Sequence, residues 1–492
     1  MSQSGLRRPV LLAAVMVASF MIAIEATIVS TAMPQIAAQL GGMNLYAWVF
    51  SSFLLTQTAT TVLFGKLADT FGRRPVLLAG IAIFLVGSLL CGFARTMPWL
   101  IAFRLIQGVG AGAIQPVSIT VVGDLYTTEE RARVQGWLAS VWGVSSVLGP
   151  LAGGLIVQHL SWAWIFWLNL PVGVIAAVMF GMFLSERPGT ARPQLDVLGA
   201  VLFVAGIAAL MVALTEAGAS HRAFLLPSIV LTLMCGAMFV WQERRAADPM
   251  IDFRLWSHRP IAATNAATLF SGVTIIGLNT FLPMYVQGVL GRSPTVAGLT
   301  LTATLLGWPI GATIASRLFV RLGLRRVMLI GAALIPVGAI AFVLVRPGMS
   351  PLLPGIGSAV LGLGMGFLSN TAIVLVQGSV GWAERGAATA STIFARSLGS
   401  TLGATVLGSV LNLSLAAQGT RPAALRHLLD APGGAVSDPA LRAALAHALH
   451  LTFWAVLAVA VCTLLLALLV PSVPLNRTTT RSPLEADELP IG

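Results

Sequence analysis

Long apolar stretches separated by short polar ones run along most of the 492 residues of this chain. Each stretch is close to the roughly 20 residues that a helix needs to cross a bilayer. Lipid offers the backbone no hydrogen-bond partners, and the stretches are too long and too evenly apolar for barrel strands, so we predict helices. The predicted spans number fourteen and lie near residues 10–31, 45–65, 75–94, 98–122, 135–157, 163–184, 195–215, 223–242, 261–285, 295–316, 327–345, 352–377, 387–412 and 450–470.

The composition agrees with a membrane protein. The chain is 57% hydrophobic and 9% charged, whereas a soluble protein carries about 25% charged residues. A net charge of +12 would suit nucleic-acid binding, but the basic residues recur in alternate loops and form no single patch. With both termini in the cytoplasm, 20 of the 29 Lys and Arg residues lie in cytoplasmic loops and 7 in outside loops. This excess follows the positive-inside rule, so we predict cytoplasmic N and C termini.

Three charged residues lie well inside predicted spans: Glu25, Arg104 and Arg396. A charge at bilayer depth costs about 2.5–3.5 kcal/mol, so these residues are functional candidates. Glu25 and Arg104 lie about 7 Å and about 9 Å outward of the middle of their spans, so we predict that they face each other. They form either a structural ion pair or a proton site whose affinity changes with their separation. For Arg396, snorkelling and a place in a cavity wall suit the sequence equally.

Two further patterns are candidates for moving parts. The charged stretch Gly65–Arg74 separates two spans; Gly72 permits a turn, and Asp69 can pair with Arg73 or Arg74. A plain positive-inside hairpin would also explain these charges. The fifth span carries small residues along one face and a helix-bending proline, which indicates either a packing seam or a special motif; its residues are Ser145, Gly149, Pro150, Gly153 and Gly154.

The chain contains an internal repeat. Glu130-Arg131 matches Glu384-Arg385 at an offset of 254 residues, and Gly72 matches Gly323 at an offset of 251. Such repeats indicate two related halves. We therefore predict a six-helix bundle, a two-helix insert with its linkers, a second six-helix bundle with a long outside loop, and a disordered cytoplasmic tail, at residues 1–186, 187–259, 260–475 (loop 413–449) and 476–492. Within the loop, Asp438 and Pro439 are predicted to begin a separate amphipathic surface helix.

The stretch Gly65-x-Leu67-Ala68-Asp69-x-x-Gly72-Arg73-Arg74 resembles the signature loop of the major facilitator superfamily, whose members rock two helical halves around a central site. Other motifs resemble its fourteen-span drug:proton antiporters: Glu25-Ala26-Thr27-Ile28-Val29, the span from Leu100 to Gly112, and Trp164 to Gly173. Glu25 stands where that family usually has Asp, and Ser145 where its antiporter motif has glycine.

The resemblance implies an all-α major facilitator fold, with two extra transmembrane helices between the bundles. It implies proton coupling through Glu25 and Arg104, and an outer seal at the motif that begins at Ser145. The gating loop would comprise Gly65, Asp69, Gly72, Arg73, Arg74 and Asp124. The protein would be a monomer in a bacterial cytoplasmic membrane, with the proton as coupling ion and neither cofactor nor metal.

A central cavity between the halves is predicted to have apolar, aromatic and a few polar walls, formed by Met33, Gln57, Gln107, Gln115, Trp142, Asn279, Trp308, Asn370, Gln377 and Phe394. Such walls suit large lipophilic ligands. We therefore expect export of hydrophobic, often cationic, drugs; export of one endogenous metabolite, lipid or self-made antibiotic is the alternative. An enzyme is disfavoured because the histidines and cysteines form no catalytic or metal-binding pattern, and no nucleotide-binding loop is present. The two-half repeat also disfavours a pore or receptor.

Overall fold

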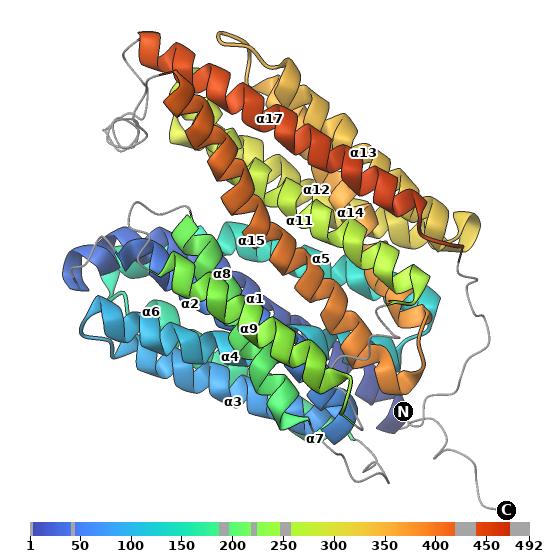
Figure 1. Cartoon of the computed structure of the whole chain (residues 1–492). Helices are drawn as coiled ribbons and strands as arrows, with labels where there is room; N and C mark the ends of the chain where they lie inside the picture. The colour runs from blue at the N-terminus through green and yellow to red at the C-terminus, as the bar shows by residue number, and fades with distance from the viewer. Residues whose placement is uncertain are drawn as a thin grey trace, which may run out of the picture.

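In the computed structural model, residues 3–40, 45–185, 196–217, 224–246, 257–418 and 439–472 are described, and every regular element within them is helical. The first bundle comprises α1 (Gln3–Leu40), α2 (Tyr46–Phe71), α3 (Arg73–Gly92), α4 (Met97–Leu125), α5 (Thr128–His159), α6 (Trp164–Trp167) and α7 (Asn169–Phe183). Next come α8 (Val197–Ala217) and α9 (Leu225–Glu243). The second bundle comprises α11 (Arg259–Met284), η2 (Tyr285–Val289), α12 (Pro294–Leu322), α13 (Leu324–Leu344), α14 (Leu352–Gly378), η3 (Trp382–Glu384), α15 (Arg385–Ala417) and α17 (Pro439–Leu468) (Figure 1).

Many of these helices are suited to lipid. Among the described residues, eleven helices are long and apolar enough to cross a membrane. The other long helices are α2, α5 and α8; α2 and α5 contain many polar residues, and the apolar part of α8, Val197–Ala213, is shorter. The chain is therefore a multi-pass membrane protein, while the exact number of fourteen spans stays a prediction.

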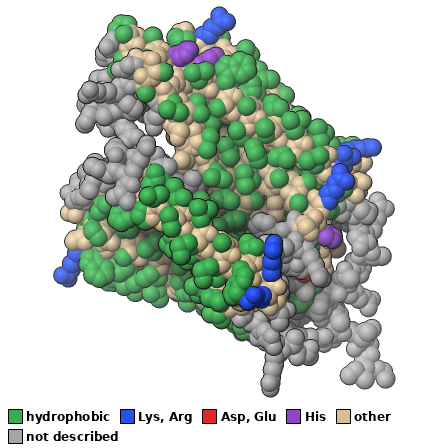
Figure 2. All heavy atoms as spheres, viewed as in Figure 1, with side chains coloured by type: hydrophobic (Ala, Val, Ile, Leu, Met, Phe, Trp, Pro, Cys, Tyr) green, Lys and Arg blue, Asp and Glu red, His purple; other side chains and the backbone are tan. Residues whose placement is uncertain are grey.

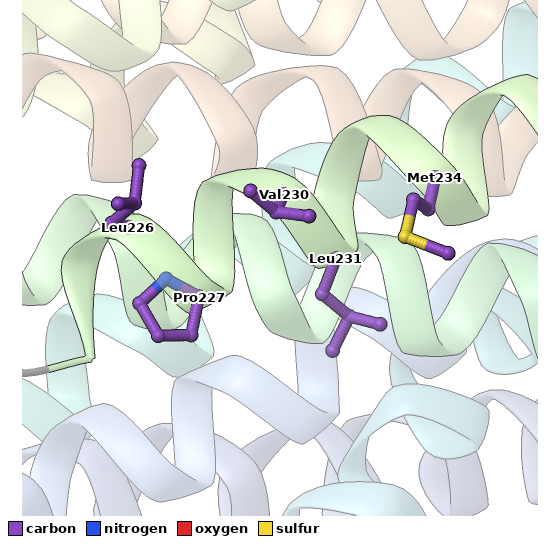
Figure 3. A pocket seen from close by; sticks show the side chains of 5 residues that line it. All are labelled: Leu226, Pro227, Val230, Leu231 and Met234. Atoms are coloured by element: carbon purple, nitrogen blue, oxygen red, sulfur yellow. The ribbon is translucent and has the colours of Figure 1, made fainter.

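The outer surface is largely apolar. Figure 2 shows hydrophobic side chains over both bundles, with Lys and Arg gathered toward the ends of the molecule. On α9, a shallow apolar groove is lined by Leu226, Pro227, Val230, Leu231 and Met234 (Figure 3). Broad exposed apolar surfaces indicate contact with other molecules or with lipid, and in a multi-pass protein the lipid provides this contact.

The two bundles repeat the same turn. Gly72 links α2 to α3 with a φ of 96°, and Gly323 links α12 to α13 with a φ of 78°. These angles favour glycine because a side chain is strained there. The equivalence of Gly72 and Gly323 inferred from the sequence is thus present in the backbone.

The bundles meet through α2 and α4 against α15, and through α5 against α12 and α14. They lie together at the end that holds the start of α1 and diverge toward the opposite end (Figure 1). We call the first of these the closed end and the second the open end. The extra helices α8 and α9 pack on each other, and α8 rests on α2 and also contacts α15.

One sequence prediction is corrected here. Residues 439–449 form no separate surface helix, because α17 runs unbroken from Pro439 to Leu468 and buries Leu445 and Leu449. The predicted sixth span, near residues 163–184, is confirmed as one candidate span, Trp164–Phe183, which comprises α6 and α7. The predicted tail, residues 476–492, and the middle of the outside loop, residues 419–438, lie outside the described residues.

Candidate functional site

Glu25 lies at the centre of a buried polar cluster in the first bundle. Its side chain is fully buried, and the Nη1 atom of Arg104 donates a hydrogen bond to its Oε1 atom. The predicted proximity of these two residues is confirmed. The Nδ2 atom of Asn169 donates to Oε2 at 2.6 Å, so both carboxylate oxygens accept a bond from another helix. Such bonding is what a buried charge requires, since an unpaired one costs several kcal/mol.

Arg104 is held by further contacts. Its Nη1 atom also donates to the Oε1 atom of Gln107 at 2.7 Å, and its Nε atom donates to the carbonyl of Val49 at 3.2 Å. Its guanidinium carbon lies 4.2 Å from the ring centroid of Phe53. These contacts fix the guanidinium against α1 and α2, so the Glu25–Arg104 pair has one well-defined geometry.

Neutral residues complete the cluster. Gln107 donates from Nε2 to the hydroxyl of Ser88 at 2.7 Å, and Asn169 donates to the same hydroxyl at 3.3 Å. The cluster therefore joins α1, α3, α4 and α7. Asn169 and Ser88 were not anticipated from the sequence; an amide and a hydroxyl within apolar spans were the available signal.

The charged stretch Gly65–Arg74 contacts the second bundle at the closed end. The Asp69 carboxylate accepts hydrogen bonds from the backbone N–H groups of Gly386 at 3.0 Å and Ala387 at 2.8 Å, in the first turn of α15. A carboxylate at a helix N-terminus satisfies free N–H groups and interacts favourably with the helix dipole. Burial raises the pKa of Asp69 to about 7, and the charge of Arg73 offsets part of that rise.

Arg73 is the buried cation of this contact. Its Nη2 atom donates to Asp69 at 2.8 Å and to the carbonyl of Trp382 at 3.0 Å, and its guanidinium lies 4.0 Å from the centroid of the Trp382 ring. Its Nε atom is 3.1 Å from the carboxylate of Asp124, which is also paired with Arg385 at 3.3 Å. Thus Asp69 pairs with Arg73. Arg74 is exposed and donates to the carbonyl of Gly181 within the first bundle.

Gly65 and Gly149, which belong to the two predicted motifs, lie at contacts between helices. At Gly65, an added Cβ would be 2.4 Å from the Cβ of Ala390, so this glycine lets α2 approach α15. At Gly149, an added Cβ would be 2.0 Å from the hydroxyl oxygen of Thr27, which itself donates to the carbonyl of Ser145 at 3.1 Å. The motif on α5 therefore packs directly against α1, two residues beyond Glu25. Gly153 is buried in the same helix, whereas a Cβ added at Gly154 would have no atom within 4 Å. The α5 helix continues through Pro150.

The predicted cavity residues do not form one lining. Met33 is fully buried in a core cluster, Gln107 belongs to the Glu25 cluster, and Phe394 packs against Phe203 of α8. Asn370 is buried and donates to the carbonyl of Ala312. These four side chains contact other protein groups in this structure. The sequence alone does not distinguish such a residue from one that contacts a ligand.

The remaining cavity candidates are scattered. Gln57, Gln115 and Trp308 are half-buried, while Trp142 and Asn279 are exposed. Gln377 is buried and donates to the carbonyl of Ile119 in the first bundle, at 3.3 Å. A recess of ≈ 610 Å³ lies instead between α5 and α12, lined by residues that the sequence did not single out: Ser140, Gly143, Val144, Leu148, Leu306, Pro309, Ile310, Thr313 and Ile314.

Residues 15–404 match the family model described as the Major Facilitator Superfamily. The chain belongs to this superfamily. It is 34% identical over 409 residues to the Multidrug transporter protein MdtP of Bacillus subtilis (strain 168), covering 82% of this chain and 76% of that protein. It is also 34% identical over 393 residues to Multidrug resistance protein 3 of the same organism, covering 79% of this chain and 77% of that protein.

A solved structure shares the fold. The human organic anion transporter MFSD10 (TETRAN) aligns with a TM-score of 0.66 and 16% sequence identity, over 93% of this chain and 99% of that chain. Members of this superfamily move solutes across membranes by rocking two bundles around a site between them. The protein is accordingly a transporter, with multidrug transporters among its relatives.

Proposed function

We propose that the protein is a proton-coupled antiporter that exports hydrophobic, often cationic, compounds. The observation that carries the proposal is the fully buried carboxylate of Glu25, held by Arg104 and Asn169 inside an apolar bundle. The named functions of the bacterial multidrug relatives support export of drugs.

The proposed coupling follows from the two charges. While Glu25 touches Arg104, its negative charge is balanced and the ionised carboxylate is stable. A shift of α1 against α4 that separated them would leave the carboxylate in apolar surroundings, where the neutral form is favoured. Proton uptake and release would then accompany the change between the two orientations of the transporter.

The proposed gate is the closed end. Asp69 and Arg73 connect the first bundle to α15 and to Trp382, and Asp124 forms an ion pair with Arg385. We place this end at the cytoplasmic face, with fourteen spans and both termini in the cytoplasm, because of the positive-inside excess. The chain would act as a monomer in a bacterial cytoplasmic membrane, with the proton as coupling ion and no other cofactor.

Reconstituted transport tests this function. Proteoliposomes holding the full chain should accumulate a lipophilic cation such as ethidium when a proton gradient is imposed, and should release protons as substrate enters. Accumulation without proton movement would contradict antiport. A panel of inhibitory concentrations with and without the gene separates drug export from the alternative, export of one endogenous metabolite, which predicts no change for unrelated drugs.

A further inference from the structure

Arg396 is the membrane-depth charge that the proposed coupling does not use. It lies on α15, about 16 Å along the helix from Arg385 at 1.5 Å per residue. Its side chain is half-buried, and Nη1 donates to the hydroxyl of Ser369 on α14 at 2.9 Å. Among the described residues, no carboxylate oxygen lies within 4.0 Å of its guanidinium, whereas Arg73, Arg104 and Arg385 each have one. Arg396 thus carries a positive charge with one neutral partner.

Its place in the fold is defined by a small apolar cluster between the bundles. Ile119 of α4 meets Ile373 of α14 and Ile393 of α15, so the cluster joins first bundle to second. Because α15 starts at the closed end and α14 finishes there, Arg396 and Ser369 lie about one helical turn from these isoleucines, on the open-end side.

The same spacing brings a third polar residue to this level. Gln115 precedes Ile119 by one turn on α4, and it is half-buried. Residues four apart share a helix face, so Gln115 belongs to the face of α4 that carries Ile119. Gln115, Ser369 and Arg396 thus all lie about one helical turn from the three isoleucines that join the bundles, on the open-end side.

We propose that Arg396, with Ser369, binds the acidic group of a lipophilic substrate, so that the substrates include amphiphilic carboxylates and zwitterions as well as cations. This rests on the proposed export function and names a substrate class for it. An unbalanced charge is costly at this depth, and a carboxylate is the group that a guanidinium's parallel N–H donors fit best. The three isoleucines are buried, so the surroundings of the guanidinium on its closed-end side are apolar. The proposed acid-binding site is separate from Glu25, because Glu25 is paired with a different cation, Arg104.

Two dyes that differ at one group test the proposal. Rhodamine B and its ethyl ester share a cationic ring system, but only rhodamine B carries a free carboxylate at neutral pH. Binding of each dye to the purified full chain in detergent is measured by fluorescence anisotropy, without a proton gradient. The wild-type chain should bind both dyes. In Arg396→Gln, the Kd for rhodamine B should rise at least about tenfold, the size expected for losing a charged hydrogen bond, and the Kd for the ester should change less than about twofold.

The controls separate this role from a structural one. Arg396→Lys keeps the charge and should restore rhodamine B binding to within about threefold of wild type, although it loses the hydrogen bonding of a guanidinium. Equal weakening of both dyes, no weakening of either, or no binding of rhodamine B to the wild type would overturn the proposal. Dye binding requires no gradient, so the difference between the dyes is measured independently of proton coupling. Failure of proton coupling is therefore distinguishable from failure of the acid site.

Discussion

The buried carboxylate of Glu25 is hydrogen-bonded through both of its oxygens. Arg104 balances its charge, Asn169 occupies its second oxygen, and no part of its side chain is exposed. Replacing it with glutamine changes one oxygen to an amide and leaves the volume nearly the same. The substitution therefore removes the titratable proton with little effect on packing.

We expect Glu25→Gln to abolish proton-driven export while the protein still folds and binds substrate. Without a carboxyl group, the residue cannot alternate between charged and neutral forms as the bundles move. Proteoliposome uptake driven by a pH gradient should fall to the level of empty vesicles, and drug binding in detergent should stay within about threefold of wild type. Glu25→Asp, which keeps the acid, serves as the matched control and should retain measurable uptake. Undiminished efflux by the glutamine variant would refute the coupling role.

The residue scale is also where sequence analysis succeeded and failed most clearly. Glu25 and Arg104 were identifiable because a charge inside an apolar span is rare and must find a partner. Asn169 was overlooked because a single amide in a span is common and gives no sign of its neighbour. The cavity role of Met33 and Phe394 stays a prediction, because an apolar residue that faces a ligand looks the same in sequence as one that faces another helix.

At the scale of elements, the contact between α1 and α5 is set by the absence of a side chain at Gly149. An added Cβ there would be 2.0 Å from the hydroxyl oxygen of Thr27, closer than packed atoms allow. The helix that carries Glu25 is thus held against the helix whose motif resembles that of antiporters. The sequence indicated a small-residue seam, but only the fold shows that its partner is α1.

We expect Gly149→Val to push α1 away from α5. Overpacking of this kind destabilises by about 1–3 kcal/mol, and the shift would also disturb Glu25 two residues from Thr27. A thermal unfolding scan should show a lower Tm, and gradient-driven uptake should decline with it. Gly154→Ala, in the same helix but with open space around it, should leave Tm unchanged or slightly higher, since alanine favours a helix. Equal losses in both variants would mean that the seam is not specific to Gly149.

At the scale of the whole molecule, the closed end depends on one carboxylate that reaches from the first bundle to the second. Asp69 accepts two backbone N–H groups at the start of α15 and also holds Arg73. From the sequence, the loop could be recognised as a turn with an ion pair. The attachment of this loop to residues more than 300 positions away could not be recognised from the sequence, because such a contact depends on how the two bundles dock.

Asp69→Asn should slow the exchange between orientations while leaving substrate binding nearly intact. The amide keeps the shape and, like the protonated acid that burial favours in the closed end, carries no charge, so the closed end is held and its opening is slowed. The maximal transport rate should fall several-fold, with the Kd for drug unchanged within about twofold. A conservative change at the neighbouring Thr70, to serine, keeps its hydroxyl and should transport normally. Equal maximal rates for Asp69→Asn and wild type would count against the loop as a gate.

The same carboxylate predicts how pH biases the two orientations. Asp69 has a pKa of about 7 in the closed end, against an ordinary value of 3.8, and an opened end would expose it to water. A group whose pKa is higher in one state favours that state at low pH, and the contribution is lost as the pH rises through the higher value. Lowering the pH from about 8 to about 5.5 should therefore raise the ratio of closed to opened ends by roughly an order of magnitude.

Distances between spin labels on α2 and α15, placed beyond the contact residues, would measure this ratio in detergent. Charged neighbours at this end include Arg73, Asp124, Arg385 and Arg131, so the control must remove the titration of Asp69 alone. Asp69→Asn does so, and its ratio should respond far less to pH than that of wild type. A wild-type ratio that shifts toward the opened end in acid would show that another group, with the opposite linkage, determines the orientation of the gate.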